Sequence, residues 1–169
     1  SFTLGARVID GASKGEVIKL GDRSIQVVPG KGHTRDSQYI VDPENKIVFT
    51  GDNILGDSSA DVQYMADYMA GLESLLDMEP EVICPGHGRP SYDAVGDIRE
   101  LIEHRKEREQ QILDAVQKGA NTPTELFWTV YGIDYKDKKG MATRQIEAHL
   151  EKLKAEGRIV KNRHRFIVS

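Results

Sequence analysis

Cysteine and long apolar runs are both scarce in this chain. Cys84 is the only cysteine among 169 residues, so no disulfide can form within the chain, and a reducing compartment, the mitochondrial matrix or the cytoplasm, is the simplest expectation. No stretch approaches the roughly 18 to 20 consecutive apolar residues that a membrane span requires, and we expect no membrane partner. Residues 1–11 lack the basic and apolar regions of a secretory signal, so any targeting segment would lie upstream of Ser1.

Two phosphate-binding signatures are also missing, although the stretch VVPGKGHTRDSQYI, residues 27–40, contains a Gly-Lys pair. A Walker A loop has Ser or Thr directly after its lysine, but Lys31 is followed by Gly32 and His33. The dinucleotide fingerprint G-x-G-x-x-G fails because Arg35 occupies the third glycine position. The glycine-flanked His33 therefore needs another explanation.

Charge is distributed unevenly along the chain. The net charge is −4, yet residues 133–169 contain ten Lys and Arg against five Asp and Glu. The preceding part is therefore strongly acidic, and an acidic body carries a basic tail.

The hydrophobic pattern divides the chain at a similar place. Up to about residue 92, short segments rich in Val, Ile and Tyr are separated by Gly, Pro, Asp and Asn, which indicates strands. Apolar residues within 65–76 recur at helical spacing and indicate a helix that covers a sheet face. From Asp93 the period is helical, so we predict an α/β domain over 1–118 that ends in a long helix at about 93–118. The predicted strands are 16–20, 24–28, 38–42, 46–50 and 81–84.

The remaining residues, 119–169, predict a small α+β domain. Thr122-Pro123-Thr124-Glu125 is a capping box with proline at the first helical position, and it opens a short helix. A second helix is expected over 142–156, with Gly157 as its stop. Two β-branched segments, 158–160 and 166–168, then flank a basic turn. This order is typical of a winged helix.

Three short motifs each follow a predicted strand: Gly32-His33-Thr34, Gly51-Asp52-Asn53 and Pro85-Gly86-His87-Gly88. Loops at the carboxyl ends of strands meet at one edge of a sheet, where such folds place ligands. His33, Asp52 and His87 can therefore converge. Two imidazoles and a carboxylate are suited to a first-row metal ion, zinc above all, and the neighbouring glycines allow sharp turns.

Each motif also has an ordinary structural interpretation. A single histidine in a loop is more often a surface residue than a metal ligand, and Gly-Asp and Pro-Gly are common turn sequences. Because all three motifs stand at strand ends, the metal site is the favoured interpretation.

The same motifs resemble those of a known family. Gly32-His33-Thr34, FTGDNILG at 49–56 and ICPGHG at 83–88 are similar to the later metal motifs of the metallo-beta-lactamase superfamily. HRKEREQQI at 104–112, followed by a winged-helix-like end, resembles the beta-lactamase-like protein 2 branch, whose members include endoribonucleases. The resemblance implies an α/β fold: the C-terminal half of a metallo-beta-lactamase αββα sandwich, followed by a small winged-helix-like α+β domain.

The resemblance further implies a hydrolase with two zinc ions. The residue that matches His33 binds one metal, the one that matches His87 binds the other, and the one that matches Asp52 bridges them. Asp52 and His87 are thus the candidate catalytic residues. Such an ion pair activates water and neutralises charge on the leaving oxygen, and the attack would be on phosphorus in RNA or on the carbonyl carbon of a thioester or lactam.

One motif of the family is absent. Members of the family take most of their zinc ligands from an upstream His-x-His-x-Asp-His motif, and this motif does not occur in the 169 residues. We therefore expect a C-terminal portion of a longer protein, inactive alone, that binds zinc weakly. Its partners would be the missing N-terminal half or a second copy in a homodimer, because an apolar sheet face would otherwise be uncovered.

The basic tail favours single-stranded RNA as the substrate, so an endoribonuclease is the leading hypothesis. The candidate RNA-binding residues are Lys139, Arg144, Lys161, Arg163 and Arg165. Trp128 and Tyr131 could stack on bases, but core packing is the favoured interpretation. One alternative is a thioester or other small-molecule hydrolase of the glyoxalase II kind. The other is a nucleic-acid-binding module without catalysis, in which the basic residues act alone.

Overall fold

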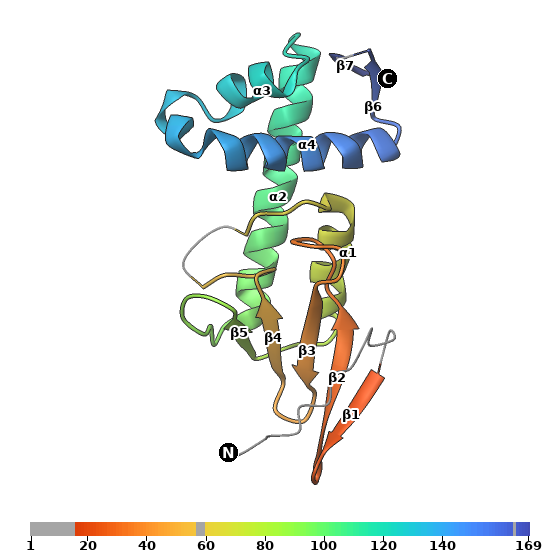
Figure 1. Ribbon diagram of the computed structural model, residues 1–169, viewed down its shortest axis with the longest axis vertical. Coiled ribbons are helices and arrows are strands. Elements are labelled where there is room, and N and C mark those ends of the chain that lie inside the picture. Colours follow the sequence, from red (N-terminus) through yellow and green to blue (C-terminus); the bar gives the residue numbers. More distant parts are fainter. Residues whose placement is uncertain (1–15, 57–59, 164) are drawn as a thin grey trace, which may run out of the picture.

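The sheet of the larger unit has five strands in sequence order. We describe a computed structural model over residues 16–56, 60–163 and 165–169; the beginning of the predicted 1–118 domain and His164 lie outside these residues. Neighbouring strands from β1 to β4 are antiparallel, whereas β4 and β5 are parallel. Consequently β2, β4 and β5 run in the same direction, and their carboxyl ends meet at the upper edge of the sheet in Figure 1. The strands are β1 (Glu16–Leu20), β2 (Arg23–Pro29), β3 (Gln38–Asp42), β4 (Ile47–Gly51) and β5 (Val82–Pro85).

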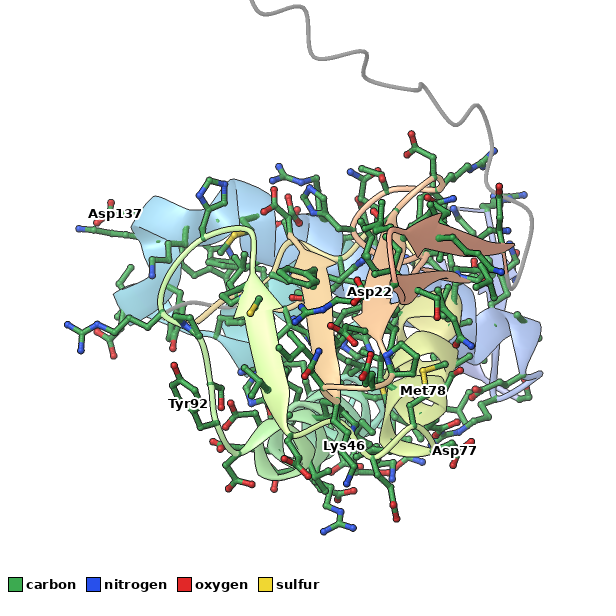
Figure 2. The ribbon with its side chains drawn as sticks, turned by 90° about the horizontal axis from the view of Figure 1, so that it is seen from below. Asp22, Lys46, Asp77, Met78, Tyr92 and Asp137 are labelled. Atoms are coloured by element: carbon green, nitrogen blue, oxygen red, sulfur yellow. The ribbon has the colours of Figure 1, made fainter. Side chains whose placement is uncertain are left out.

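Two helices cover one face of this sheet. α1 (Met65–Leu76) and α2 (Ala94–Gln117) lie on the same side of it when the molecule is seen from below (Figure 2). Their apolar faces pack with inward side chains of the strands into one buried cluster. Its fully buried members include Tyr39, Val48, Tyr68, Leu72, Leu75, Ile83 and Ile98. The alternation of buried and exposed residues along β3 and β4 follows from the two-residue repeat of a strand.

The opposite face of the sheet is apolar and partly open. Val27, Ile40, Phe49 and Cys84 are register partners across β2 to β5, so they form one row on that face. Ile40 is 40% exposed and Phe49 is 45% exposed. The expected uncovered apolar surface is therefore present at these two side chains. None of the helices in the described residues is both long and apolar enough to cross a membrane.

A second apolar cluster organises the C-terminal elements. It joins the end of α2 to α3 (Pro123–Val130), α4 (Lys139–Ala155) and the hairpin of β6 (Ile159–Asn162) and β7 (Arg165–Val168). A 3₁₀ segment, η1 (Ile133–Lys138), leads into α4. The expected capping box is present, since Thr122 Oγ1 accepts from Glu125 N and Glu125 Oε2 accepts from Thr122 N. Helices followed by a hairpin form the winged-helix arrangement, and α4 begins three residues before the predicted start.

Helix α2 runs through both clusters, and a buried charge network fixes α4 against it. The Glu109 carboxylate of α2 accepts from Lys152 Nζ at 3.0 Å and from Arg158 Nη1 at 2.9 Å. His149 Nδ1 lies 3.5 Å from Glu109 Oε2 and is almost fully buried. Burial alone would raise the pKa of Glu109, but its contacts with His149 and Lys152 outweigh burial and lower the pKa to about 2. Burial lowers the pKa of His149.

Acidification should destabilise the protein through this network. The folded state keeps His149 neutral while the unfolded chain protonates it below its ordinary pKa of 6.5, so stability is lost as the pH falls through 6.5. Protonation of Glu109 lowers the free energy of unfolding by a further amount on the order of 2–3 kcal/mol as the pH falls from about 4.5 toward 2. Thermal unfolding midpoints between pH 8 and pH 3 would test this expectation. Glu109→Gln should flatten the acidic part of the curve, and a midpoint that rises between pH 8 and pH 5 would contradict the assignment.

Candidate metal centre

The structure brings His33, Asp52 and His87 together at the upper edge of the sheet. His33 follows β2, Asp52 follows β4 and His87 follows β5, and these three strands share one direction. Asp52 lies between the two imidazoles. Its Oδ2 is 4.0 Å from His33 Nε2, and its Oδ1 is 3.6 Å from His87 Nε2. All three side chains reach solvent, with 31% of His33, 42% of Asp52 and 80% of His87 exposed.

Close backbone contacts hold the three loops in place. Gly86 N donates to Gly51 O at 2.8 Å, and a Cβ atom at residue 86 would lie 2.7 Å from Asp52 Oδ1. Only glycine therefore lets the loop after β5 approach Asp52 this closely. Asn53 is buried, and its Oδ1 accepts from His33 N at 3.1 Å. The loops after β2, β4 and β5 thus form one connected unit.

The ring of His33 is oriented by a backbone carbonyl. Its Nδ1 lies 2.7 Å from Asp61 O. A carbonyl oxygen only accepts hydrogen bonds, so Nδ1 carries the proton and the lone pair resides on Nε2. Nε2 faces Asp52 Oδ2. Metal-binding histidines are commonly held in this way, with the distal ring nitrogen donating to a carbonyl or carboxylate.

The separations between the ligand atoms fit shared cations. Two atoms about 2.0–2.2 Å from one zinc ion lie about 3.3–3.8 Å apart at tetrahedral to trigonal angles. The 3.6 Å between Asp52 Oδ1 and His87 Nε2 falls in this range, and the 4.0 Å on the His33 side is slightly longer. Each Asp52 oxygen faces a different imidazole, which suits a bridging carboxylate. Across residues 16–56, 60–163 and 165–169, no group of three or more His, Cys, Asp and Glu residues is placed to hold a single ion.

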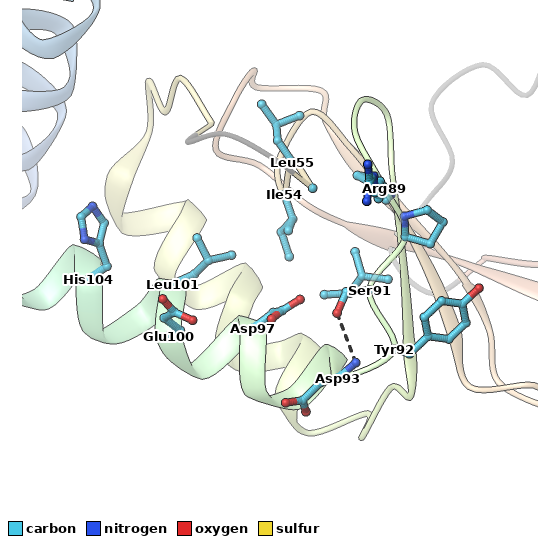
Figure 3. Close-up of a pocket in the computed structure, with 14 residues that line it drawn as sticks. Ile54, Leu55, Arg89, Ser91, Tyr92, Asp93, Asp97, Glu100, Leu101 and His104 are labelled. Atoms are coloured by element: carbon cyan, nitrogen blue, oxygen red, sulfur yellow. Dashed lines mark hydrogen bonds between the residues drawn. The ribbon is translucent and has the colours of Figure 1, made fainter.

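A pocket of about 800 Å³ lies beside the His87 loop (Figure 3). One wall is α2, where Asp97, Glu100 and His104 stand on one side, and the opposite wall includes Arg89. Its apolar lining comes from Ile54, Leu55, Ile83 and Leu101. Burial and the nearby Arg105 and Arg108 lower the pKa of His104, although Glu107 and Glu100 oppose this shift. The pocket combines an apolar base with charges of both signs, and no sequence motif predicted it.

Sequence profiles of two families match the chain. The Metallo-beta-lactamase superfamily profile matches residues 4–87, and that of the Beta-lactamase associated winged helix domain matches residues 122–165. The chain belongs to the metallo-beta-lactamase superfamily. His33, Asp52 and His87 all fall within the first matched region. Both the mixed fold and the winged-helix end agree with the resemblance that the sequence motifs gave.

Curated relatives of this metallo-beta-lactamase chain include beta-lactamase-like proteins and thioesterases. It is 34% identical over 140 residues to the Beta-lactamase-like protein 2 homolog of Drosophila melanogaster, covering 80% of the chain and 47% of that protein. The homolog of Caenorhabditis elegans is 28% identical, and the match covers 87% of this chain and 50% of that protein. The Atrochrysone carboxyl ACP thioesterase of Aspergillus fumigatus is 26% identical, and the match covers 70% of this chain and 41% of that protein. The chain therefore spans about half the length of the curated relatives it matches.

Solved structures show the same fold. A Beta-lactamase domain protein from Burkholderia ambifaria superposes with a TM-score of 0.83 at 21% identity, covering 93% of this chain and 51% of that one. A metallo-beta-lactamase family protein from Thermus thermophilus superposes with a TM-score of 0.77 at 22% identity, and the match covers 93% of this chain and 53% of that one. At this identity the likeness concerns the fold alone.

The five predicted RNA-binding residues of the metallo-beta-lactamase chain do not form one surface. Lys161, Arg163 and Arg165 are exposed on the β6–β7 hairpin, at the carboxyl end of α4 (Figure 1). Lys139 lies at the other end of α4, a distance of about 25 Å for 17 helical residues, and its Nζ is 5.2 Å from the centre of the Trp128 ring. Arg144 instead forms an ion pair with Asp61. Arg144 therefore has a structural role that its charge alone did not indicate.

The aromatic residues of α3 differ in burial. Trp128 is 43% exposed, so the expectation that it packs in the core was wrong. It is the third residue from the end of α3, and its ring stands edge-on to the ring of Phe127. Tyr131 stacks on the buried Phe127 and carries Arg108 over its other face, as expected for a packed ring. Cys84 is half-buried in β5.

Removal of the Asn53 side chain should loosen the candidate metal centre without altering its charge. Asn53→Ala leaves the His33 N–H without its buried acceptor, which costs about 1–3 kcal/mol. Thermal unfolding would report the loss, and the amide resonance of His33 would report the local change. Asn45→Ala removes an exposed turn amide that donates to the side chain of Asp42 and should cost less than about 1 kcal/mol. Equal losses in the two variants would show that Asn53 does not organise the loops.

Proposed function

We propose that the whole protein is a hydrolase with two metal ions, most suitably zinc, held in part by His33, Asp52 and His87. The observation that carries the proposal is the placement of Asp52, whose two oxygens face the Nε2 atoms of different histidines. A single-ion site would direct all three side chains to one point. Three protein ligands are too few to fill two tetrahedral zinc sites, so the remaining ligands would come from elsewhere in the whole protein.

The chain's own residues have defined parts in this proposal. His33 presents a lone pair at Nε2 because its Nδ1 proton is engaged by Asp61 O. Asp52 would offer one carboxylate oxygen to each ion, because its two oxygens face different imidazoles. His87, which is the most exposed of the three, faces the side from which a substrate can approach. Bound ions would supply activation of water and neutralisation of the leaving oxygen.

Single-stranded RNA is the substrate that the charge distribution supports best. The metal centre lies at the edge of the sheet that faces α4 (Figure 1), so a nucleic acid held by the winged helix would have its backbone near the site. Lys161, Arg163 and Arg165 make no ion pair within 4 Å among the described residues, which leaves their charge available for phosphates. Trp128 is an exposed ring beside a lysine, a combination suited to base stacking. We therefore propose an endoribonuclease.

A thioester hydrolase is the second candidate. It is favoured by the similarity to an ACP thioesterase and by the apolar base of the pocket beside His87. Such an enzyme would need the metal centre and the pocket but not the basic hairpin. A binding module without catalysis would need only the hairpin.

The apolar row on the open sheet face fits a second sheet. In the whole protein we propose that the other half of the αββα sandwich covers Ile40 and Phe49, whose exposure would otherwise favour association. A second copy of the chain is the alternative occupant of the same face.

Asp52→Ala in the whole protein should abolish cleavage of a single-stranded RNA while leaving RNA binding largely unchanged. We expect at least about a 100-fold loss of rate, because even groups that only orient metal ligands are worth 10- to 100-fold. Gel-based cleavage and binding assays with the same RNA would measure both properties. Asp22→Ala, in the exposed turn between β1 and β2 at the lower end of the sheet (Figure 1), serves as the matched control. Parallel loss of cleavage and binding would argue against a bridging role for Asp52.

Neutralising the hairpin should weaken RNA binding and its salt dependence. In the triple variant Lys161→Gln, Arg163→Gln and Arg165→Gln, three phosphate contacts are lost, so the slope of log K against log salt should fall by about 2. Lys46→Gln removes an exposed lysine from the turn between β3 and β4, at the end of the molecule away from the hairpin (Figure 1), and should leave the slope unchanged. If the wild-type protein does not cleave RNA, and both it and the triple variant cleave a thioester at the same rate, the thioester hydrolase would replace the endoribonuclease as the proposed function.

A further inference from the structure

The loop that orients His33 is held by the winged helix. Asp61, whose carbonyl accepts from His33 Nδ1, also has its carboxylate bound by Arg144 of α4. Asp61 Oδ2 accepts from Arg144 Nη2 at 2.6 Å and from Arg144 Nε at 3.2 Å. These residues are 83 positions apart in the sequence. One residue of the loop therefore contacts the metal-ligand histidine with its backbone and the C-terminal unit with its side chain.

The preceding residue is held from the same helix. The carbonyl of Ala60, a buried residue, accepts from Gln145 Nε2 at 2.7 Å and from Arg105 Nη2 at 3.1 Å. Arg105 Nη1 also donates to Gln145 Oε1 at 2.9 Å. Two consecutive residues of α4 thus bind two consecutive residues of the loop. Because side-chain contacts fix both Ala60 and Asp61, the direction of the Asp61 carbonyl depends on where α4 lies.

The other side of the loop is tied to the His33 segment itself. Gln63 N and Tyr64 N both donate to Gly32 O, at 2.8 and 3.0 Å. The loop is therefore fixed at two points, by Gly32 on one side and by α4 on the other. Asp61 Oδ1 is buried and has no hydrogen-bond partner within the part of the chain that the structure describes. A carboxylate in that position is stabilised mainly by the guanidinium at Oδ2, since an unpaired buried charge is costly.

We infer that Arg144 is a positioning residue for the metal centre and acts through Asp61 on the ring of His33. This inference rests on the proposed function in one respect, that His33 is a metal ligand. Loss of the guanidinium leaves the Asp61 carboxylate partly buried without a counter-charge, so the carboxylate turns toward solvent and the carbonyl loses its fixed direction. The Nδ1 proton of His33 then has no fixed acceptor, and the Nε2 lone pair is no longer held toward Asp52. The winged helix is in this sense part of the metal site.

The tautomer of His33 tests the inference without any metal. Ring nitrogen resonances of the ¹⁵N-labelled 169-residue chain, recorded at about pH 8.5 where free histidines are neutral, should show the proton on Nδ1. In Arg144→Gln we expect the population with the proton on Nε2 to rise at least several-fold. Asp61→Asn keeps the loop's size and carbonyl and should have the same effect. Lys154→Gln removes another positive charge from α4, where Lys154 pairs with Glu151, and should leave the tautomer unchanged.

Zinc affinity of the whole protein provides the second readout. Arg144→Gln should weaken zinc binding about 10- to 100-fold, as expected when the partner of a ligand histidine is disturbed, while Arg144→Lys should restore part of it. An unchanged tautomer in Arg144→Gln and Asp61→Asn would overturn the inference, whatever the metal affinity. A shifted tautomer with unchanged zinc affinity would also overturn it. If the wild-type protein binds no zinc, the proposed function fails, and the tautomer result shows separately whether Arg144 orients the ring.

Discussion

The burial of helix α2 in two apolar clusters is the constraint on which the rest of the molecule depends. Ile98 and Ile102 pack under the sheet, whereas Ile112 and Val116 pack with α3 and α4. Because the 24-residue helix is continuous, it sets both the spacing and the rotation between the two clusters. α4 is thereby placed above the edge where β2, β4 and β5 end (Figure 1). The candidate metal centre and the winged helix face one another for this reason.

Buried polar contacts fix the position of α4 along α2. Apolar side chains of similar size can slide past one another at small cost, but a buried charge or amide must keep its partners. Glu109 binds Lys152 and Arg158 of the C-terminal elements, and Arg105 binds Gln145 and the Ala60 carbonyl. A shift of α4 along α2 would break both sets of contacts at once. The same contacts that fix the helices also fix the loop that orients His33.

Local patterns in the sequence predicted most of the fold and the three candidate ligands. The strands, the long helix and the capping box each depend on neighbouring residues, and Gly32-His33 and Gly86-His87 mark strand ends directly. What could not be predicted depends on residues far apart. Arg144 was assigned to RNA because only its charge and its neighbours are visible in the sequence, whereas its partner Asp61 is 83 residues away. Trp128 was placed in the core because the helical pattern shows which residues are apolar but not how far a ring projects.

The surface charges distinguish the candidate substrates better than the metal ligands do. Within the part of the chain that the structure describes, four of the ten basic side chains in residues 133–169 form ion pairs: Arg144, Lys152, Lys154 and Arg158. The other six fall into two groups, on η1 with the start of α4 and on the hairpin, at opposite ends of that helix (Figure 1). A polyanion that contacts both groups must follow α4, and α4 passes over the edge that carries His33. A small thioester would contact neither group, so this charge pattern supports the proposal of a long anionic substrate.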